Sequence, residues 1–322
     1  MSLARLVAAP NRVLRGLGRH ATWFLAGGIF LGIVAPPLAA WARPLLTPAI
    51  FLLMLVTLLR IDPRALRMAF ERPRLVAATV AWVLIGMPLA LWPLLQLLDM
   101  DGFLGDHLLM TAAAAPIVSA AAYALLLGLD AAFALAVGVV ATILVPFTLP
   151  LLAGLLLGVD LPLSPLDLWL RLLLLIGGAA VVATLVRRHA GATWIARQAP
   201  AFDGLAVVAL LGFGLAVMDG VTVTALEEPR FALACLVAAF ALALSLMLAG
   251  TLLFLGCDRQ TALTVGLLSA FNNFGVVVAA MGSAAPQATI VFLGIAQLPI
   301  YLLPLVLKPL ILRLQRDRRG PR

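Results

Sequence analysis

Two adjacent carboxamides, Asn272 and Asn273, lie in the middle of the apolar run LLSAFNNFGVVVAAM. Their side chains carry four donor hydrogens and four acceptor lone pairs, which packing against apolar neighbours does not easily satisfy. Ser269 lies four residues before Asn273, so these two side chains share one face if the run is helical. We therefore predict that Asn272, Asn273 and Ser269 contribute to a site that binds a solute, an ion or a water.

Further polar side chains occur deep in two other apolar runs, again as pairs four residues apart. The pairs are Ser119 with Tyr123, and Gln297 with Tyr301. A Ser in a membrane helix often donates to its own backbone, and a Tyr or Gln can pack with a single hydrogen bond, so a structural role is the alternative. We include Ser119, Tyr123 and Gln297 in the candidate site, where Ser119 lines the same point as the asparagines and the other two shape the solute cavity.

The sequence contains no arrangement typical of catalysis. Cys235 and Cys257 lie in or beside apolar runs and form neither a disulfide framework nor a metal-ligand cluster. We find no activated nucleophile and no phosphate-binding loop, and no carboxylate falls in the middle of an apolar run. We therefore expect no enzyme activity, no metal and no other cofactor, and a carboxylate-based proton relay is not supported.

The composition predicts a polytopic membrane protein. The chain of 322 residues is 64% apolar and 11% charged, with a mean hydropathy of +1.14, whereas soluble domains are about half apolar and a quarter charged. The runs are solidly apolar instead of alternating, which favours helices over a barrel. The net charge of +8 comes from basic residues beside these runs and not from a patch with interleaved aromatics, so we expect no nucleic-acid partner.

Because a helical span needs roughly 20 apolar residues, the chain is long enough for about ten spans. The predicted spans lie near residues 21–36, 44–60, 75–98, 107–128, 131–158, 165–187, 202–219, 231–256, 260–282 and 285–312. With both termini in the cytoplasm, most Arg residues fall on the cytoplasmic side, as the positive-inside rule requires. We predict the inner membrane of a bacterium, with basic cytoplasmic segments at 1–19 and 313–322; a signal peptide is the alternative for the first run.

The two halves of the chain resemble each other. A shift of 153 positions aligns the fourth and fifth predicted spans with the ninth and tenth without a gap, and places Ser119 against Asn272. A repeat of five spans must insert its second copy inverted, and inverted repeats with a binding site at their interface recur in transporters. We therefore predict two inverted five-helix repeats, at 20–160 and 161–312.

Two of the predicted spans contain residues that break helices. Pro116 lies inside the fourth span, where its ring removes a backbone donor and disfavours helix in the preceding residue. Gly275 follows the two asparagines in the ninth span and is a weaker breaker. We expect both helices to be discontinuous, because paired interruptions in the two halves mark the binding site of many transporters.

Three segments of the chain together indicate a family resemblance: LLTPAIFLLMLVTLLRIDPRALRMAFERPR, AAAAPIVSAAAYALLLGLDAAFALAVGVVATILVPFTLPLL and QTALTVGLLSAFNNFGVVVAAMG. With these segments the chain resembles the bile acid:sodium symporter family over residues 20–312. The resemblance implies an all-α fold of ten helices in two inverted five-helix repeats. It also implies a panel domain, a core domain whose two broken helices cross near mid-membrane, and transport of organic anions, often with sodium, by alternating access.

This chain departs from the family at the residues that bind sodium. The family pattern Pro-Gly-Gly-Thr-x-Ser-Asn corresponds here to Pro116 followed by IVSAAA. The family's Glu in the ninth span corresponds to Leu268, or to Gly266 in a register shifted by two residues. Sodium sites favour several oxygen ligands, usually including a negative one. We therefore expect Asn272 and Asn273 to hold a solute or a water in preference to a sodium ion.

Taken together, the residues and the resemblance predict a secondary transporter of a small organic, anionic solute. Its partners are this solute and the lipid bilayer, and it is expected to be a monomer or a homodimer. Two alternatives stay open. One is a carrier like the cation/proton antiporters, which would need an acid in mid-span, and the other is a non-transporting membrane sensor or assembly protein on the same fold.

Overall fold

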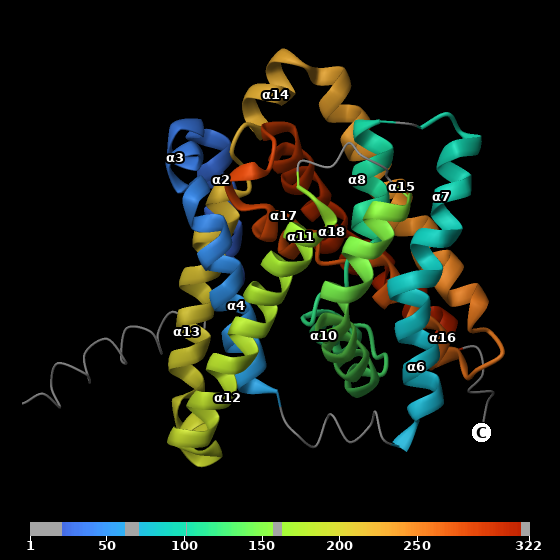
Figure 1. The fold of residues 1–322 in the computed structure, drawn as a ribbon. Helices are drawn as coiled ribbons and strands as arrows, with labels where there is room; N and C mark the ends of the chain where they lie inside the picture. Colours follow the sequence, from blue (N-terminus) through green and yellow to red (C-terminus); the bar gives the residue numbers. More distant parts are fainter. Residues whose placement is uncertain (1–20, 62–70, 101, 157–162, 317–322) are drawn as a thin grey trace, which may run out of the picture. The chain divides into compact units, whose positions relative to one another are not determined.

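The structure is a computed structural model that describes residues 21–61, 71–100, 102–156 and 163–316, which are almost entirely helical (Figure 1). The β pairing among these residues is limited to one isolated bridge. Seven helices in the described part of the chain are long and apolar enough to cross a bilayer, namely Pro36–Arg60, Pro73–Leu97, Ala131–Leu156, Pro165–Ala190, Ala192–Glu227, Pro229–Leu253 and Gln287–Leu314. The chain is therefore an all-α polytopic membrane protein, which confirms the class predicted from composition.

Three of the ten predicted spans are not among these seven helices. Helix α2 (Ala21–Val34) begins at the first described residue, and the spans predicted near 107–128 and 260–282 are both interrupted. The number of ten spans and the inverted repeat remain predictions. The predicted basic segment at 1–19 lies outside the described residues, as do residues 317–322 of the predicted tail.

The chain forms two compact units whose segments alternate along the sequence. Unit 1 is drawn from residues 1–61, 170–229 and 278–294, and unit 2 from residues 62–169, 230–277 and 295–322. The predicted limits at 20–160 and 161–312 describe internal repeats and not packing units, so this division does not test them. Several of the described helices have residues in both units, namely α11 (Pro165–Leu172), α17 (Phe274–Met281), α18 (Gln287–Arg316) and, by its first residue alone, α15 (Pro229–Leu253).

The described part of unit 1 is built from helices of different lengths, of which α13 (Ala192–Ala216) is the longest. They are α2, α3 (Pro36–Ala42), η2 (Arg43–Leu45), α4 (Leu46–Arg60), η4 (Leu173–Gly177), α12 (Gly178–Ala190), α13 (Ala192–Ala216), α14 (Val221–Glu227) and η5 (Gly282–Ala284). Helix α13 packs along both α2 and α4, and α12 packs along α4 (Figure 1). A Cβ atom at Gly28 would lie 2.8 Å from the carbonyl oxygen of Leu211, so α2 approaches α13 closely because that position has no side chain.

A buried acid in unit 1, Asp219, is paired with Arg43. Nη1 of Arg43 lies 3.4 Å from Oδ2 of Asp219 and also donates to Oε1 of Gln287. Nη2 of Arg43 donates to the carbonyl oxygen of Ala285 at 2.9 Å, and Nε2 of Gln287 donates to the carbonyl oxygen of Asp219 at 3.1 Å. One guanidinium thus joins η2, the turn after α13 and the chain around the start of α18.

We expect Arg43→Ala to lower the free energy of unfolding by about 1–3 kcal/mol, because it leaves a carboxylate that is only 7% exposed without its cation. Thermal unfolding in detergent measures this loss. Arg230→Ala is the matched control, since Arg230 is exposed and has no ion pair within the described residues. The double variant Arg43→Ala/Asp219→Asn should recover part of the loss; no recovery would mean that packing of the Arg43 side chain, and not the charge pair, supplies the stability.

Unit 2 surrounds the long helix α10 (Ala131–Leu156). Its other helices are α6 (Pro73–Ala81), the π-helical turn η3 (Trp82–Gly86), α7 (Met87–Leu97), α8 (Phe103–Ala113), α9 (Ala120–Leu126), α15 (Pro229–Leu253) and α16 (Arg259–Ala270). Helix α10 contacts α6, α8, α9 and α16. It therefore forms the centre of this unit and supports both interrupted helices.

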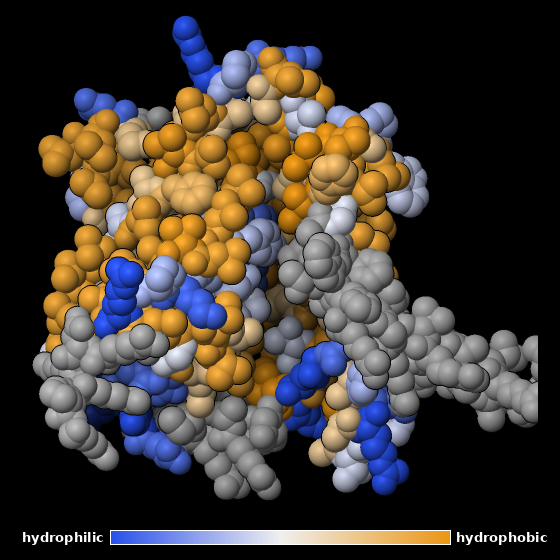
Figure 2. Space-filling view, turned by 180° about the vertical axis from the view of Figure 1, so that it is seen from behind, coloured by the Kyte–Doolittle hydropathy of each residue, from blue (hydrophilic) through white to orange (hydrophobic). Residues whose placement is uncertain are grey.

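Large apolar side chains are exposed on helices of both units. Examples are Val181 on α12, and Val237 and Leu248 on α15. Figure 2 shows one face of the molecule, on which hydrophobic residues predominate. Such a surface would promote aggregation in water, whereas acyl chains cover it without cost in a bilayer.

Candidate functional site

Unit 2 contains two interrupted helices. In the first, α8 ends at Ala113, residues 114–119 are not helical, and α9 follows. Pro116 lies inside this break, where it was predicted. In the second, α16 ends at Ala270 and α17 begins at Phe274. The break at residues 271–273 therefore lies within the predicted stretch SAFNNFG, but Gly275 is inside α17, so its predicted role as the helix breaker is corrected.

The two breaks pair with each other through their backbones, which explains why the second break precedes the glycine. The N–H of Ile117 donates to the carbonyl oxygen of Phe271 at 2.8 Å, and the N–H of Asn273 donates to that of Ala115 at 2.7 Å. Between these two bonds lies an antiparallel bridge of Pro116 and Asn272. In this type of pair the two opposed residues exchange no hydrogen bond, so the missing N–H of proline costs nothing. The unwound backbone thereby finds the internal partners that lipid cannot supply.

Asn272 has an unpaired acceptor where the two breaks pair. We call this region, formed by residues 114–119 and 271–273, the crossing. Its side chain is only 3% exposed, and its Nδ2 donates to the carbonyl oxygen of Ser269 at 3.1 Å. Its Oδ1 is buried and has no hydrogen-bond partner. A flipped amide is excluded, because the carbonyl oxygen of Ser269 can only accept. The crossing therefore holds one buried oxygen that a ligand or a water could bind.

Asn273 and Ser119 occupy the same position in the two interrupted helices. Asn273 directly precedes α17, and its carbonyl oxygen accepts the N–H of Val276 at 3.1 Å. Ser119 is the N-cap residue of α9, and its exposed hydroxyl makes no capping bond. The carboxamide of Asn273 is partly exposed. The repeat register, which places Ser119 against Asn272, remains a prediction.

Four helix ends face the region of the breaks. The C-terminal ends of α8 and α16 and the first residues of α9 and α17 directly flank residues 114–119 and 271–273. A helix carries partial negative charge at its C-terminus and partial positive charge at its N-terminus. The crossing can therefore stabilise either sign of charge without an ionised side chain.

Ser269 has partners on both sides in the structure. Its fully buried hydroxyl donates to the carbonyl oxygen of Val265 at 2.8 Å and accepts from Nε1 of Trp82 at 3.0 Å. These contacts indicate that Ser269 positions the C-terminal end of α16, and they favour this structural role over binding of a solute. Sequence reasoning missed Trp82, because an isolated Trp in an aliphatic span carries no signal of the π-helical turn that presents its indole to Ser269.

Aromatic rings flank the second break. The ring of Tyr123 lies 5.3 Å from that of Phe271, edge to face. The ring of Phe274 lies 6.0 Å from that of His107, which is stacked on Phe103 at 3.9 Å. Of these residues only Tyr123 was predicted for the site; the others have no polar spacing pattern that could have marked them.

Gln297 and Tyr301 lie together on α18, in the part that belongs to unit 2. The hydroxyl of Tyr301 donates to Oε1 of Gln297 at 3.4 Å, and Gln297 is buried. The spacing of four residues thus brings the two side chains into contact, as predicted for one helix face. Gln297 remains a predicted cavity residue.

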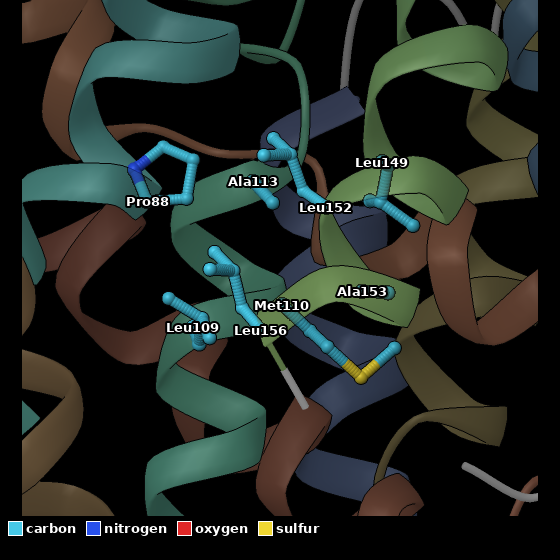
Figure 3. A pocket seen from close by; sticks show the side chains of 8 residues that line it. All are labelled: Pro88, Leu109, Met110, Ala113, Leu149, Leu152, Ala153 and Leu156. Carbon is cyan, nitrogen blue, oxygen red and sulfur yellow. The ribbon is translucent and has the colours of Figure 1, made fainter. Parts of the chain in front are cut away.

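A pocket in unit 2 is wholly apolar and is a poor candidate for the solute site. Figure 3 shows its lining side chains, which come from α7, α8 and α10: Pro88, Leu109, Met110, Ala113, Leu149, Leu152, Ala153 and Leu156. None of them offers a polar side-chain atom to an organic anion, so this pocket is a small gap between packed helices.

Hydrogen bonds of polar side chains stabilise the first turns of α16. Oδ1 and Oδ2 of Asp258 accept from the N–H and the hydroxyl of Thr261, at 3.0 and 2.6 Å. The hydroxyl of Thr264 donates to the carbonyl oxygen of Gln260 at 2.6 Å and accepts the N–H of Asp130 at 3.2 Å. These bonds fix α16 at its start and join it to the start of α10.

The Asp258 cap predicts a pH dependence of stability. Burial acts to raise its pKa, but the hydrogen bonds from Thr261 and the charge of Arg72 outweigh this, so the pKa lies below the ordinary Asp value of 3.8. Its contribution is therefore complete above the unfolded pKa and is lost as the pH falls from about 4 through the lower folded value. We expect Asp258→Ala to cost about 1 kcal/mol at neutral pH. The difference in unfolding temperature between this variant and the wild type should shrink below pH 4, and a constant difference would contradict a role for the charge.

No group of three or more His, Cys, Asp or Glu side chains placed to hold a metal ion occurs among the described residues. No protein-family model matches the chain, and no curated protein is significantly similar to it.

Proposed function

We propose that the chain is a secondary transporter, which moves a small organic solute by alternating access on a fold similar to that of the bile acid:sodium symporters. The buried, unpaired Oδ1 of Asn272 at the paired breaks of two helices carries this proposal. Discontinuous helices that place unwound backbone at mid-membrane are a recurring way to build a transporter site. An unpaired buried acceptor costs about 1–3 kcal/mol, and a site that a ligand completes accounts for that cost.

The two compact units also support the proposal. Both interrupted helices belong to unit 2, except for the end of α17. The resemblance implies a core domain with two broken helices and a panel domain without them. We therefore assign the core role to unit 2 and the panel role to unit 1, with ten helices in two inverted repeats.

The solute that we propose is a small organic anion. The side chains of Asn272, Asn273 and Tyr123 carry no formal charge, and the N-terminal end of α17 begins directly after the asparagines. Backbone N–H groups at a helix N-terminus are a suitable site for a carboxylate or a sulfonate. The Oδ1 of Asn272 additionally needs a donor, which a hydroxyl group of the solute or a bound water would supply.

Sodium is not proposed as the coupling ion. Leu268, at the position where the resemblance implies a Glu, is completely buried in unit 2. It supplies no charged oxygen.

The distribution of Arg residues supports an inner-membrane location with both termini in the cytoplasm.

Uptake into proteoliposomes tests the proposed function. We expect small organic anions to be accumulated, and the same vesicles should be assayed with an imposed sodium gradient, a proton gradient or none. Uptake that needs sodium would overturn the proposed absence of sodium coupling. A sodium-specific rise of the unfolding temperature, measured in NaCl against KCl, would do the same without any knowledge of the solute.

Two other functions predict different results in this assay. A carrier like the cation/proton antiporters would exchange an inorganic cation for protons and ignore organic anions, but the side chains at the crossing include no carboxylate. A non-transporting sensor or assembly protein would accumulate none of the solutes. In that case cells carrying Asn272→Ala and Asn273→Ala would behave as the wild type.

A further inference from the structure

The turn between α12 and α13, in unit 1, carries a cluster of basic side chains. The chain reverses direction at Gly191, which has φ +79° (Figure 1). The basic residues near this turn are Arg60, Arg187, Arg188, His189 and Arg197.

Two of these arginines already have partners within the protein. Nη2 of Arg187 donates to three carbonyl oxygens at the C-terminal end of α4, at 2.8 to 3.2 Å. Arg60 forms an ion pair with Asp203. These two side chains therefore stabilise unit 1 and are not available to a ligand.

Arg188 and Arg197, unlike Arg187 and Arg60, have no such partners within the described residues. Both side chains are exposed, and neither has a hydrogen bond or an ion pair within the described residues. They lie on either side of Gly191, at the end of α12 and near the start of α13. This end of unit 1 therefore carries two unneutralised guanidinium groups, which attract an anion.

An apolar stripe on α12 leads to Arg188. Val181 and Leu185 are 59% and 49% exposed, and the spacing of four and three residues places Val181, Leu185 and Arg188 on one face. At 1.5 Å per residue the stripe from Val181 to Arg188 is about 10 Å long. It therefore fits within the hydrocarbon layer of one leaflet, which is about 15 Å thick.

Helix α13 adds an interfacial anchor. Trp194 is 44% exposed and contacts Phe202 edge to face. It precedes Arg197 by three residues, so the two side chains share a face. Trp side chains are enriched at the level of lipid headgroups, where the ring is half in hydrocarbon and the N–H meets water.

We propose that the α12–α13 turn binds an anionic phospholipid, with the phosphate between Arg188 and Arg197 and one acyl chain along Val181 and Leu185. The paired charges favour an anionic headgroup over a zwitterionic one. The apolar stripe favours a lipid over a free phosphate, because a free phosphate would leave Val181 and Leu185 without a partner. This site shares no residue with the two helix breaks and does not depend on the proposed transport activity.

Thermal unfolding of the full chain in neutral detergent tests the proposal. We expect phosphatidylglycerol to raise the unfolding temperature by several degrees more than phosphatidylcholine at the same mole fraction. Arg188→Gln/Arg197→Gln should lose more than half of this difference, whereas Arg188→Lys/Arg197→Lys should keep most of it. The matched control is Arg74→Gln/Arg230→Gln, which removes two exposed charges elsewhere and should keep the whole difference.

Three results would overturn the proposal. The first is an unchanged lipid effect in Arg188→Gln/Arg197→Gln, and the second is an equal loss in the control pair, which would indicate a response to net charge alone. The third is a rise of the same size with glycerol 3-phosphate, which has the charge but no acyl chain. The unfolding temperature of each variant in phosphatidylcholine reports whether it is folded before the lipid effect is compared.

Discussion

Asn272→Leu is expected to lower uptake of the transported solute roughly tenfold or more while leaving the protein as stable as the wild type or more stable. The substitution removes a buried acceptor without a partner, which costs about 1–3 kcal/mol in the empty protein. It also removes the bond from Nδ2 to Ser269, which contributes about 0.5–1.5 kcal/mol. The two effects on stability offset each other, whereas the solute loses a hydrogen-bonding partner outright.

Uptake per folded protein and unfolding temperature, measured on the same preparations, check this prediction. Thr264→Val is the matched control, because Thr264 is equally buried on α16 and its hydroxyl has two partners within the protein. This variant should show the opposite behaviour, a lower unfolding temperature with uptake within about twofold of wild type. Asn272→Leu with normal uptake would mean that Asn272 only packs, and the site would have to be sought elsewhere in the chain.

The largest loss of stability is expected from Gly266→Val. A Cβ atom at this position would lie 2.0 Å from Oγ1 of Thr251 and 2.7 Å from the carbonyl oxygen of Met247, so α16 must move away from α15. Overpacking of this kind typically costs about 1–3 kcal/mol, and more where backbone is displaced. Because α16 ends at the crossing, the same movement would strain the backbone pairing of the two breaks.

Thermal unfolding in detergent measures this effect, and Gly212→Ala provides the control. Gly212 lies within α13, and a Cβ atom there would meet nothing within 4 Å, so alanine should stabilise the helix by about 0.5–1 kcal/mol. Adding Thr251→Ala to Gly266→Val removes the nearest contact and should restore part of the loss. Equal stabilities of Gly266→Val and wild type would show that α15 and α16 are packed less closely than described.

The contact between α15 and α16 differs from the contact between the two breaks, and the difference has a physical reason. Small residues let two membrane helices approach until their backbones touch, and van der Waals packing then holds them. At the breaks the backbone itself needs hydrogen bonds, because lipid offers none. Pairing of the two breaks supplies these backbone hydrogen bonds but leaves Oδ1 of Asn272 without a partner. This unpaired oxygen makes the crossing a candidate binding site, whereas the contact between α15 and α16 is structural.

Much of the fold could be predicted from the sequence. The apolar runs near 131–158 and 231–256 correspond to the helices Ala131–Leu156 and Pro229–Leu253, because a span in lipid must be long, apolar and internally hydrogen-bonded. Pro116 marked the first break, since its ring excludes a regular helix. The second break lies at residues 271–273, within the stretch SAFNNFG where it was predicted, but Gly275 does not make it, because glycine permits an interruption and does not require one.

The sequence by itself determined the class of the molecule and the polar residues worth examining, since composition and spacing depend only on the order of residues. The tertiary structure alone decided what those residues touch. Asn272 and Asn273 look alike in the sequence, but the pairing of residues 271–273 with residues 115–117 buries the first with an unpaired oxygen and places the second before α17. The spacing in the sequence predicted that Ser269 shares a helix face with Asn273, but α16 ends at Ala270, and an indole from a distant π-helical turn donates to the Ser269 hydroxyl. Contacts between segments more than a hundred residues apart leave no trace in local spacing, because they depend on how helices pack and not on the order of residues within one helix.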